Sequence, residues 1–159
     1  MSKFNKNELV MHVRDGLCKI VDISKISDND YYVLVCVSTE EKLYVPINNA
    51  DQVIRKIMSE AEAYDYLNKL KEITKEFNLN TKQRRDAYRR KLSSGTIDDY
   101  FFLYRQYYLL KFKNEGEHLG PIDNEMLLKA HRMVLEEMVI VFNKTEDEIE
   151  EFLVNIIEA

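Results

Sequence analysis

The spacing at which apolar residues recur changes once along this chain, close to Ile57. Before that point, apolar residues alternate with polar ones or form short β-branched runs, a pattern typical of strands. The predicted strands cover residues 9–13, 17–23, 31–37, 42–46 and 52–57. After Ile57, apolar residues recur every three or four positions, which is typical of amphipathic helices. The chain of 159 residues is therefore predicted to be an α+β protein with two parts, residues 1–57 and 58–159.

Short turn-forming segments separate the five predicted strands. They lie at residues 14–16, 27–30, 39–41 and 48–51 and are rich in Asp, Asn, Glu and Ser. Connections this short require neighbouring strands to pair antiparallel. Five short strands cannot cover a flat sheet on both sides, so we expect a small, strongly curved antiparallel β-barrel.

Helix start and stop signals divide the second part into a bundle of about five helices. Ser59 with Glu62 forms a capping box, in which each side chain satisfies an amide of the first turn. Thr96 with Asp99 and Thr145 with Glu148 repeat that pattern. The predicted helices begin at Ser59 with apolar positions through Phe77, cover residues 82–93 before Gly95, begin again at Thr96, cover residues 123–142, and begin at Thr145. Residues 114–122, with two glycines and a proline, are predicted to be a loop.

Charge is divided unevenly along the chain. The whole sequence carries 23 basic and 28 acidic side chains, a net charge of −5, which does not by itself indicate a nucleic-acid-binding protein. Residues 80–113, however, hold 9 basic and 3 acidic side chains, whereas residues 114–159 hold 3 and 12. Six basic residues cluster in the predicted second helix around Tyr88: Lys82, Arg84, Arg85, Arg89, Arg90 and Lys91.

The basic cluster has two interpretations. Guanidinium groups pair with phosphate oxygens and release counterions, and an aromatic ring adds a stacking surface, so the cluster suits nucleic acid. Alternatively, a basic helix beside an acidic one is a solvated face that forms ion pairs within the molecule. The acidic run at residues 146–151 is equally open, because carboxylates at a helix start are stabilised by the helix dipole without any partner.

Catalytic, metal and membrane functions have little support. Cys18 and Cys36 lie far apart in the sequence without CxxC spacing, which argues against a disulfide framework or a thiolate metal site and fits a reducing compartment. The three histidines match no metal-ligand or nucleophile motif, and the four glycines form no phosphate-binding loop. No apolar run reaches the ~20 residues that a bilayer span needs. We expect a cytoplasmic monomer, not an enzyme, with no cofactor and no metal.

The order of these elements resembles the CarD/CdnL family of bacterial transcription regulators. Four stretches carry the resemblance: Phe4 with residues 7–23, residues 31–37 with the Val45-Pro46 strand ending, residues 82–95 with the Ser94-Gly95 stop and Arg105 beyond it, and residues 126–137. Together they cover nearly the whole chain.

The resemblance implies a role in transcription. The family's first module is a Tudor-like barrel, shared with transcription-repair coupling factor, that binds the β subunit of RNA polymerase. Its helical half contacts promoter DNA at the upstream edge of the melted bubble and modulates the open complex. Carried onto this sequence, the polymerase-binding candidates are Ile26, Leu43, Tyr44 and Val45. The DNA-binding candidates are Thr81, Lys82, Arg84, Arg85, Arg89 and Arg90, acting weakly and without base recognition.

One departure from the family keeps a second function open. Members usually carry a Trp wedge just before the basic helix, whereas this chain has Thr81 there and no Trp anywhere. A threonine cannot insert comparable apolar surface into a base step. The alternative function is therefore an adaptor that binds polymerase or another protein and whose helical half no longer binds DNA.

Overall fold

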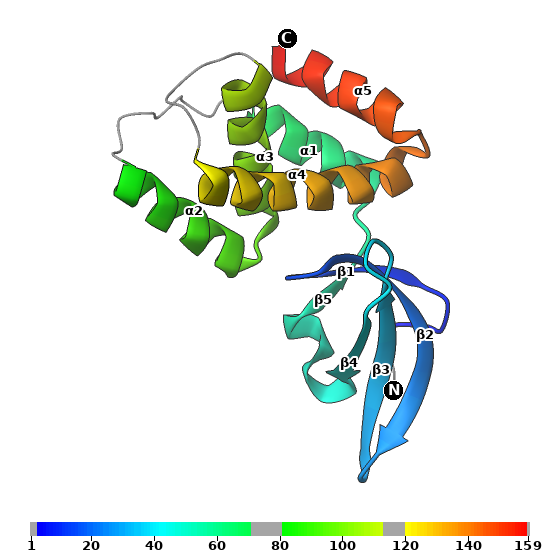
Figure 1. Cartoon of the computed structure of the whole chain (residues 1–159). Coiled ribbons are helices and arrows are strands. Elements are labelled where there is room, and N and C mark those ends of the chain that lie inside the picture. Colours follow the sequence, from blue (N-terminus) through cyan, green and yellow to red (C-terminus); the bar gives the residue numbers. More distant parts are fainter. Residues whose placement is uncertain (1–2, 71–80, 113–119, 159) are drawn as a thin grey trace. The chain divides into compact units, whose positions relative to one another are not determined.

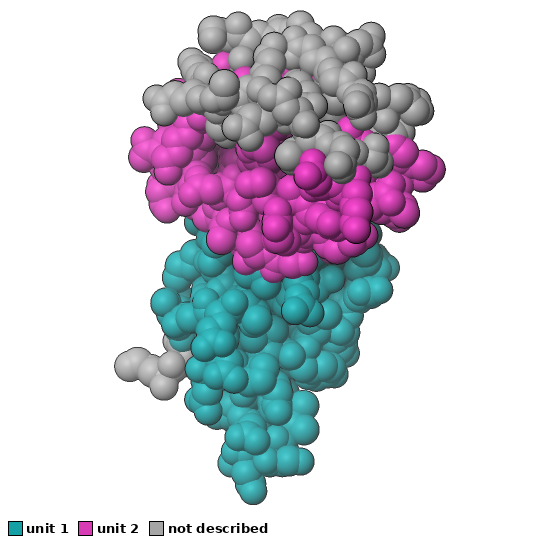
Figure 2. Space-filling model, turned by 90° about the vertical axis from the view of Figure 1, so that its left-hand side faces the viewer, with its two compact units in different colours: residues 1–57 teal, residues 58–159 magenta. Residues whose placement is uncertain are grey.

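The computed structural model describes residues 3–70, 81–112 and 120–158 (Figure 1). The chain divides into two compact units, residues 1–57 and 58–159, each with a hydrophobic core of its own (Figure 2). Unit 1 is built from strands and unit 2 from helices, so the predicted α+β fold class is confirmed.

Unit 1 is one antiparallel sheet with the strand order β4-β3-β2-β1-β5. Its elements are β1 (Leu9–His12), β2 (Gly16–Ile26), β3 (Asn29–Cys36), β4 (Lys42–Pro46), a 3-10 helix η1 (Ile47–Gln52) and β5 (Ile54–Lys56). The register shifts between Ile20 and Asp22, where β2 has an irregularity against β3. The two edge strands of the sheet are β4 and β5, and η1 connects them along the chain.

The predicted bounds of the first and third strands differ from the structure by one or two residues, and the differences at the second and last strands have an identifiable physical reason. The second strand was predicted to end at residue 23 but continues to Ile26, because Ser27 and Asp28 both adopt positive φ, of 49° and 69°, and make a tight two-residue turn. The last strand was predicted to begin at residue 52. It begins at Ile54, because the chain after Pro46 first turns through η1.

The core of unit 1 follows from strand alternation. Val10, Ile20, Tyr32 and Leu34 are fully buried on one face of the sheet, and the Tyr32 hydroxyl accepts a 3.1 Å hydrogen bond from the Phe4 amide. Cys18 and Cys36, distant in sequence, are directly paired across β2 and β3 as buried free thiols. Sequence spacing therefore gave no indication of their proximity.

Unit 2 contains the helices α1 (Glu60–Leu70), α2 (Thr81–Ser94), α3 (Ile97–Phe112), α4 (Pro121–Phe142) and α5 (Glu146–Glu158). The core lies chiefly between α3 and α4, where Leu103, Leu127, Ala130 and Met138 have no exposed surface. Tyr104 and Tyr108 of α3 are buried as well.

All three predicted capping pairs are present. Ser59 and Glu62 exchange two backbone hydrogen bonds of 3.2 Å, and Thr145 and Glu148 do the same. The Asp99 amide donates to the Thr96 hydroxyl at 3.3 Å. Side-chain caps of this kind satisfy amides that have no partner inside the helix, so they fix where each helix begins.

One predicted loop is too long at its C-terminal end. Pro121 and Ile122 were predicted to lie in the loop 114–122 but belong to α4, because a proline at the first helical position has no amide to satisfy and is preset for the helix. Two apolar positions predicted for the first helix, Ile73 and Phe77, lie outside the described residues. In the part of the chain that is described, no helix is long and apolar enough to cross a membrane.

Candidate functional site

The two faces of α2 differ in chemistry. Arg84, Tyr88 and Leu92 are spaced four residues apart and therefore lie on one side of the helix. Arg84 and Tyr88 are only 7% and 4% exposed, and Leu92 packs against the core of unit 2. This inward face fixes α2 against the rest of the helical unit.

A buried ion cluster joins α2 to the first turn of α4. The Arg84 Nη2 atom lies 2.9 Å from Oδ2 of Asp123, and the Arg85 Nε atom lies 3.3 Å from Oδ1. Asp123 has no exposed surface, so its charge is compensated by two guanidinium groups rather than by water. Burial raises the pKa of the neighbouring Tyr88 to about 12, although the Arg84 charge acts in the opposite direction.

The opposite face of α2 presents basic groups to solvent. Lys82, Arg89 and Arg90 are exposed, and Asp86 lies among them with a carboxylate oxygen 3.7 Å from Nη1 of Arg89. Arg89 and Arg90 also line a hollow at the C-terminal end of the helix, together with Ser93 and Ser94. Of the predicted DNA contacts, these three exposed cations are therefore accessible to a phosphate backbone.

The remaining predicted DNA contacts are placed differently. Arg84 lies inside, and one third of the Arg85 side chain is exposed beside Asp123. Thr81 is the first residue of α2, and its side chain is outside the described part of the structure. The ion-pair interpretation therefore describes the inward arginines, which pair within the molecule, and the nucleic-acid interpretation stays a prediction for the outward cations, which face solvent.

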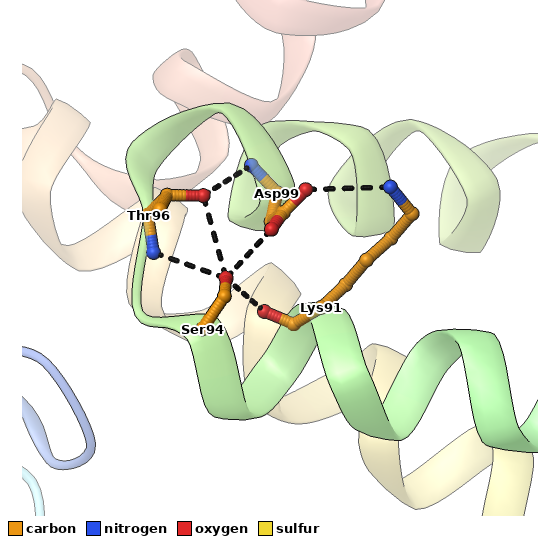
Figure 3. A network of polar contacts seen from close by, with 4 residues as sticks. All are labelled: Lys91, Ser94, Thr96 and Asp99. Atoms are coloured by element: carbon orange, nitrogen blue, oxygen red, sulfur yellow. Dashed lines mark hydrogen bonds and ion pairs between the residues drawn. The ribbon is translucent and has the colours of Figure 1, made fainter.

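A polar network fixes the end of α2 to the start of α3 (Figure 3). The Ser94 hydroxyl donates to the Asp99 carboxylate at 2.6 Å, and the Lys91 ammonium lies 3.3 Å from the same carboxylate. Burial alone raises the pKa of Asp99, but the hydrogen bonds of Ser94 and Thr96 and the Lys91 charge hold that pKa below its usual range. Gly95 turns the chain between the helices with a φ of 71°.

Strand β4 is an edge of the sheet in unit 1. It pairs only with β3 in the ladder, so its outer side carries backbone amides and carbonyls without a strand partner. An edge of this kind can accept an added strand from another protein through main-chain hydrogen bonds.

The predicted polymerase contacts do not all lie together. Leu43, Tyr44 and Val45 are consecutive on β4, with Tyr44 51% exposed, Leu43 half-buried and Val45 buried in the core against Tyr32. Ile26 is 43% exposed at the end of β2. In the register of the sheet, Ile26 lies two residues beyond the position that is level with the last residue of β4. Tyr44 and the β4 backbone are therefore the accessible part of this set.

These features define a class of protein: a small antiparallel β module with an open edge strand, followed by a helical unit with an exposed basic helix. Within the described residues, no three His, Cys, Asp or Glu side chains are grouped as metal ligands would be. An open edge strand and an exposed basic helix are surfaces suited to contact with another macromolecule.

Comparison with known families identifies that class. Residues 4–58 match the CarD-like/TRCF RID domain, and residues 64–154 match the CarD C-terminal domain. The chain belongs to the CarD family, whose members are transcription regulators and whose first domain interacts with RNA polymerase. No curated protein matches the chain.

Sequence reasoning missed the structural role of Asp123. Asp123 was expected only to begin a helix, and Arg84 was expected to lie on a solvated basic face, with phosphate or with acidic side chains of the molecule as its partner. A signal was available for Arg84, because the apolar residues Tyr88 and Leu92 follow it at the same helical spacing. No comparable signal marks Asp123, because its burial depends on how α2 packs on α4.

Proposed function

We propose that this chain regulates transcription by docking on the RNA polymerase β subunit through unit 1 and contacting promoter DNA through the exposed face of α2. The observation that carries the proposal is the match of residues 4–58 to a polymerase-interacting domain. The open edge of β4 and the exposed ring of Tyr44 supply the docking surface. Val45 takes part through its main chain, since its side chain is only 3% exposed.

The DNA contact rests on Lys82, Arg89 and Arg90. Their charges neutralise phosphates and do not read bases, so binding is weak, strongly salt-dependent and indifferent to sequence. Docking on polymerase raises the local concentration of DNA around α2, so that a weak contact is sufficient to modulate the open complex.

The salt dependence of binding to fork-junction promoter DNA tests the basic face. Converting Lys82, Arg89 and Arg90 together to Ala is expected to reduce the slope of log affinity against log salt by about 3. The control removes the exposed lysines Lys19, Lys25 and Lys42 from unit 1, which changes the net charge equally. An unchanged slope in the α2 triple variant, or an equal loss in the control, contradicts the DNA contact.

Binding to a fragment of the polymerase β subunit tests unit 1. Tyr44→Ala is expected to weaken binding about tenfold or more, as the loss of an exposed aromatic contact in an interface does. Val37→Ala is the control, because Val37 is also 51% exposed but lies outside β4. A β fragment that does not retain the parent chain contradicts the docking proposal.

A second candidate function is an adaptor whose unit 2 contacts protein and not DNA. The inward pairing of Arg84 and Arg85 with Asp123 favours it, because this pairing leaves fewer cations for phosphate. The same DNA titration separates the two candidates: the adaptor predicts β-fragment binding with no salt-dependent affinity for the fork DNA.

A further inference from the structure

A cavity of about 390 Å³ lies between α3, α4 and α5, away from the basic face of α2. One wall is formed by three tyrosines of α3 at positions i, i+3 and i+4: Tyr104, Tyr107 and Tyr108. Tyr104 and Tyr108 are buried and Tyr107 is partly exposed, so Tyr107 is the member of this wall that reaches solvent. The faces of such rings carry negative charge density and attract cations.

His131 of α4 extends this aromatic wall. Its ring stacks on Tyr104 at a centroid distance of 5.0 Å and lies 4.7 Å from the ring of Tyr107. Burial lowers the pKa of His131, and the Glu150 carboxylate only partly offsets this effect. The imidazole is therefore uncharged at neutral pH and does not repel a cation.

The opening of the cavity is acidic. Asp147, Glu150 and Glu151 of α5 line it at positions one helical turn apart. Glu150 lies 3.3 Å from Nε2 of His131. Asp147 and Glu151 are exposed, and neither carboxylate pairs with a cation among the residues that the structure describes. Glu146 and Glu148, also exposed, continue the negative surface along α5.

We propose that this cavity, the tyrosine-acid pocket, binds the cationic side chain of a lysine or arginine presented by a basic segment of a partner protein. An alkyl chain or guanidinium plane packs on the tyrosines while its charge meets the carboxylates at the opening. The cavity is large enough to admit one long side chain.

The occupant is a protein segment because the negative surface extends beyond the pocket. The exposed carboxylates Glu146 and Glu148 lie outside the cavity, so one small cation bound inside it does not reach them. A protein segment can reach them, because its neighbouring basic residues extend beyond the cavity. Nucleic acid is excluded by the same charge, since α5 carries acidic residues and no basic ones. The inference does not depend on polymerase docking or on DNA contact by α2.

The test uses the full chain alone, without polymerase or DNA, so its result is independent of the proposed function. Backbone amide NMR shifts are followed during titration with N-acetyl-arginine-amide, N-acetyl-lysine-amide and the neutral isostere N-acetyl-citrulline-amide. A peptide of alternating Arg and Gly residues is titrated in parallel. We expect the charged compounds, but not the citrulline compound, to shift amides near residues 104–108 and 147–154, and the peptide to bind at least about tenfold more tightly than the single amino-acid amides.

Two sets of variants locate the contact. Asp147→Asn with Glu151→Gln is expected to weaken peptide binding about tenfold or more, whereas Glu40→Gln with Glu41→Gln, which changes the net charge equally in unit 1, leaves binding unchanged. Tyr107→Leu keeps apolar bulk but removes the ring, and it also weakens binding. The carboxylate positions are exposed, so these variants are expected to fold as the parent does.

Three results would overturn the proposal. Citrulline shifts equal to arginine shifts show that charge is not recognised. Equal losses in the two carboxylate pairs show a general charge effect and no pocket. A peptide that binds no more tightly than the single amino-acid amides assigns the pocket to a free small cation, which overturns the protein segment as occupant.

Discussion

At the scale of single residues, the most consequential group in unit 2 is the buried Asp123 carboxylate. Asp123→Ala removes the carboxylate that lies 2.9 Å from the buried Arg84 guanidinium, and loss of one partner from a buried pair costs about 3–5 kcal/mol of unfolding free energy. The matched change is Asp86→Ala, which removes an exposed carboxylate 3.7 Å from Arg89. We expect that change to cost at most about 1 kcal/mol in urea unfolding followed by circular dichroism. Equal losses in the two variants would show that the buried cluster does not stabilise the packing of α2 on α4.

His131 makes the stability of unit 2 depend on pH. Burial lowers the pKa of the imidazole, the charge of Arg132 lowers it further, and the carboxylates Glu150 and Glu146 do not fully restore it. The unfolded chain therefore binds this proton more tightly than the folded one. The contribution to stability is complete above the ordinary pKa of 6.5 and is lost as pH falls toward the lowered value.

Between pH 6.5 and the lowered pKa of His131, the expected loss of unfolding free energy is at most about 1.4 kcal/mol for each unit of pH. His131→Gln should flatten the dependence of unfolding free energy on pH between pH 7 and 5.5, as measured by chemical denaturation at each pH. His12→Gln changes a histidine of unit 1 and serves as the control. A parent-like pH dependence in the His131 variant would contradict this assignment.

At the scale of elements, substitutions of two adjacent aspartates compare the junction between α2 and α3 with an exposed ion pair. Asp99→Ala removes the carboxylate that accepts a hydrogen bond from Ser94 and lies beside Lys91 (Figure 3). We expect this change to lower the unfolding free energy by about 1–2 kcal/mol. Asp98→Ala removes only an exposed contact 3.8 Å from Lys69, with an expected loss within about 0.5 kcal/mol. Thermal unfolding of both variants measures the difference, and a larger loss for Asp98→Ala would contradict the role of the junction.

A helix or strand could be predicted when the residues that determine it lie close together in the sequence. The three capping pairs were predictable because each helix start is set by residues three positions apart, as at Thr145 and Glu148. The antiparallel strands were predictable because alternation and short connections leave few arrangements. The 3-10 helix after Pro46 was not predictable, since nothing in residues 47–52 distinguishes it from an irregular turn.

The candidate sites were predictable in composition but not in exposure. The residue types identified α2 as a basic helix, and the spacing of Tyr88 and Leu92 could have placed Arg84 on the inward face, but the pairing of Arg84 with Asp123 depends on how the helices pack. The tyrosine-acid pocket was even harder to predict from the sequence. Its walls come from three helices that are separated in sequence.

At the scale of the whole molecule, the chain joins two units that each have their own core. A contact made by one unit therefore does not require the fold of the other to change. If both units bind one polymerase–promoter complex, the second contact becomes intramolecular and the joint affinity rises without any new interaction. Neither contact needs to be strong by itself, which is consistent with the three exposed cations on the outer face of α2.

This arrangement predicts how the two surfaces combine. The parent chain is expected to bind a preassembled polymerase–promoter complex at least about 100-fold more tightly than it binds the same DNA alone, as measured with a fluorescent label on the chain. Tyr44→Ala should remove most of that advantage, whereas Val37→Ala should keep it. The α2 triple variant, with Lys82, Arg89 and Arg90 changed to Ala, should weaken binding in both settings, because it removes the DNA contact itself. If the triple variant binds the complex as tightly as the parent, unit 2 contributes nothing through DNA, and the adaptor function is the correct one.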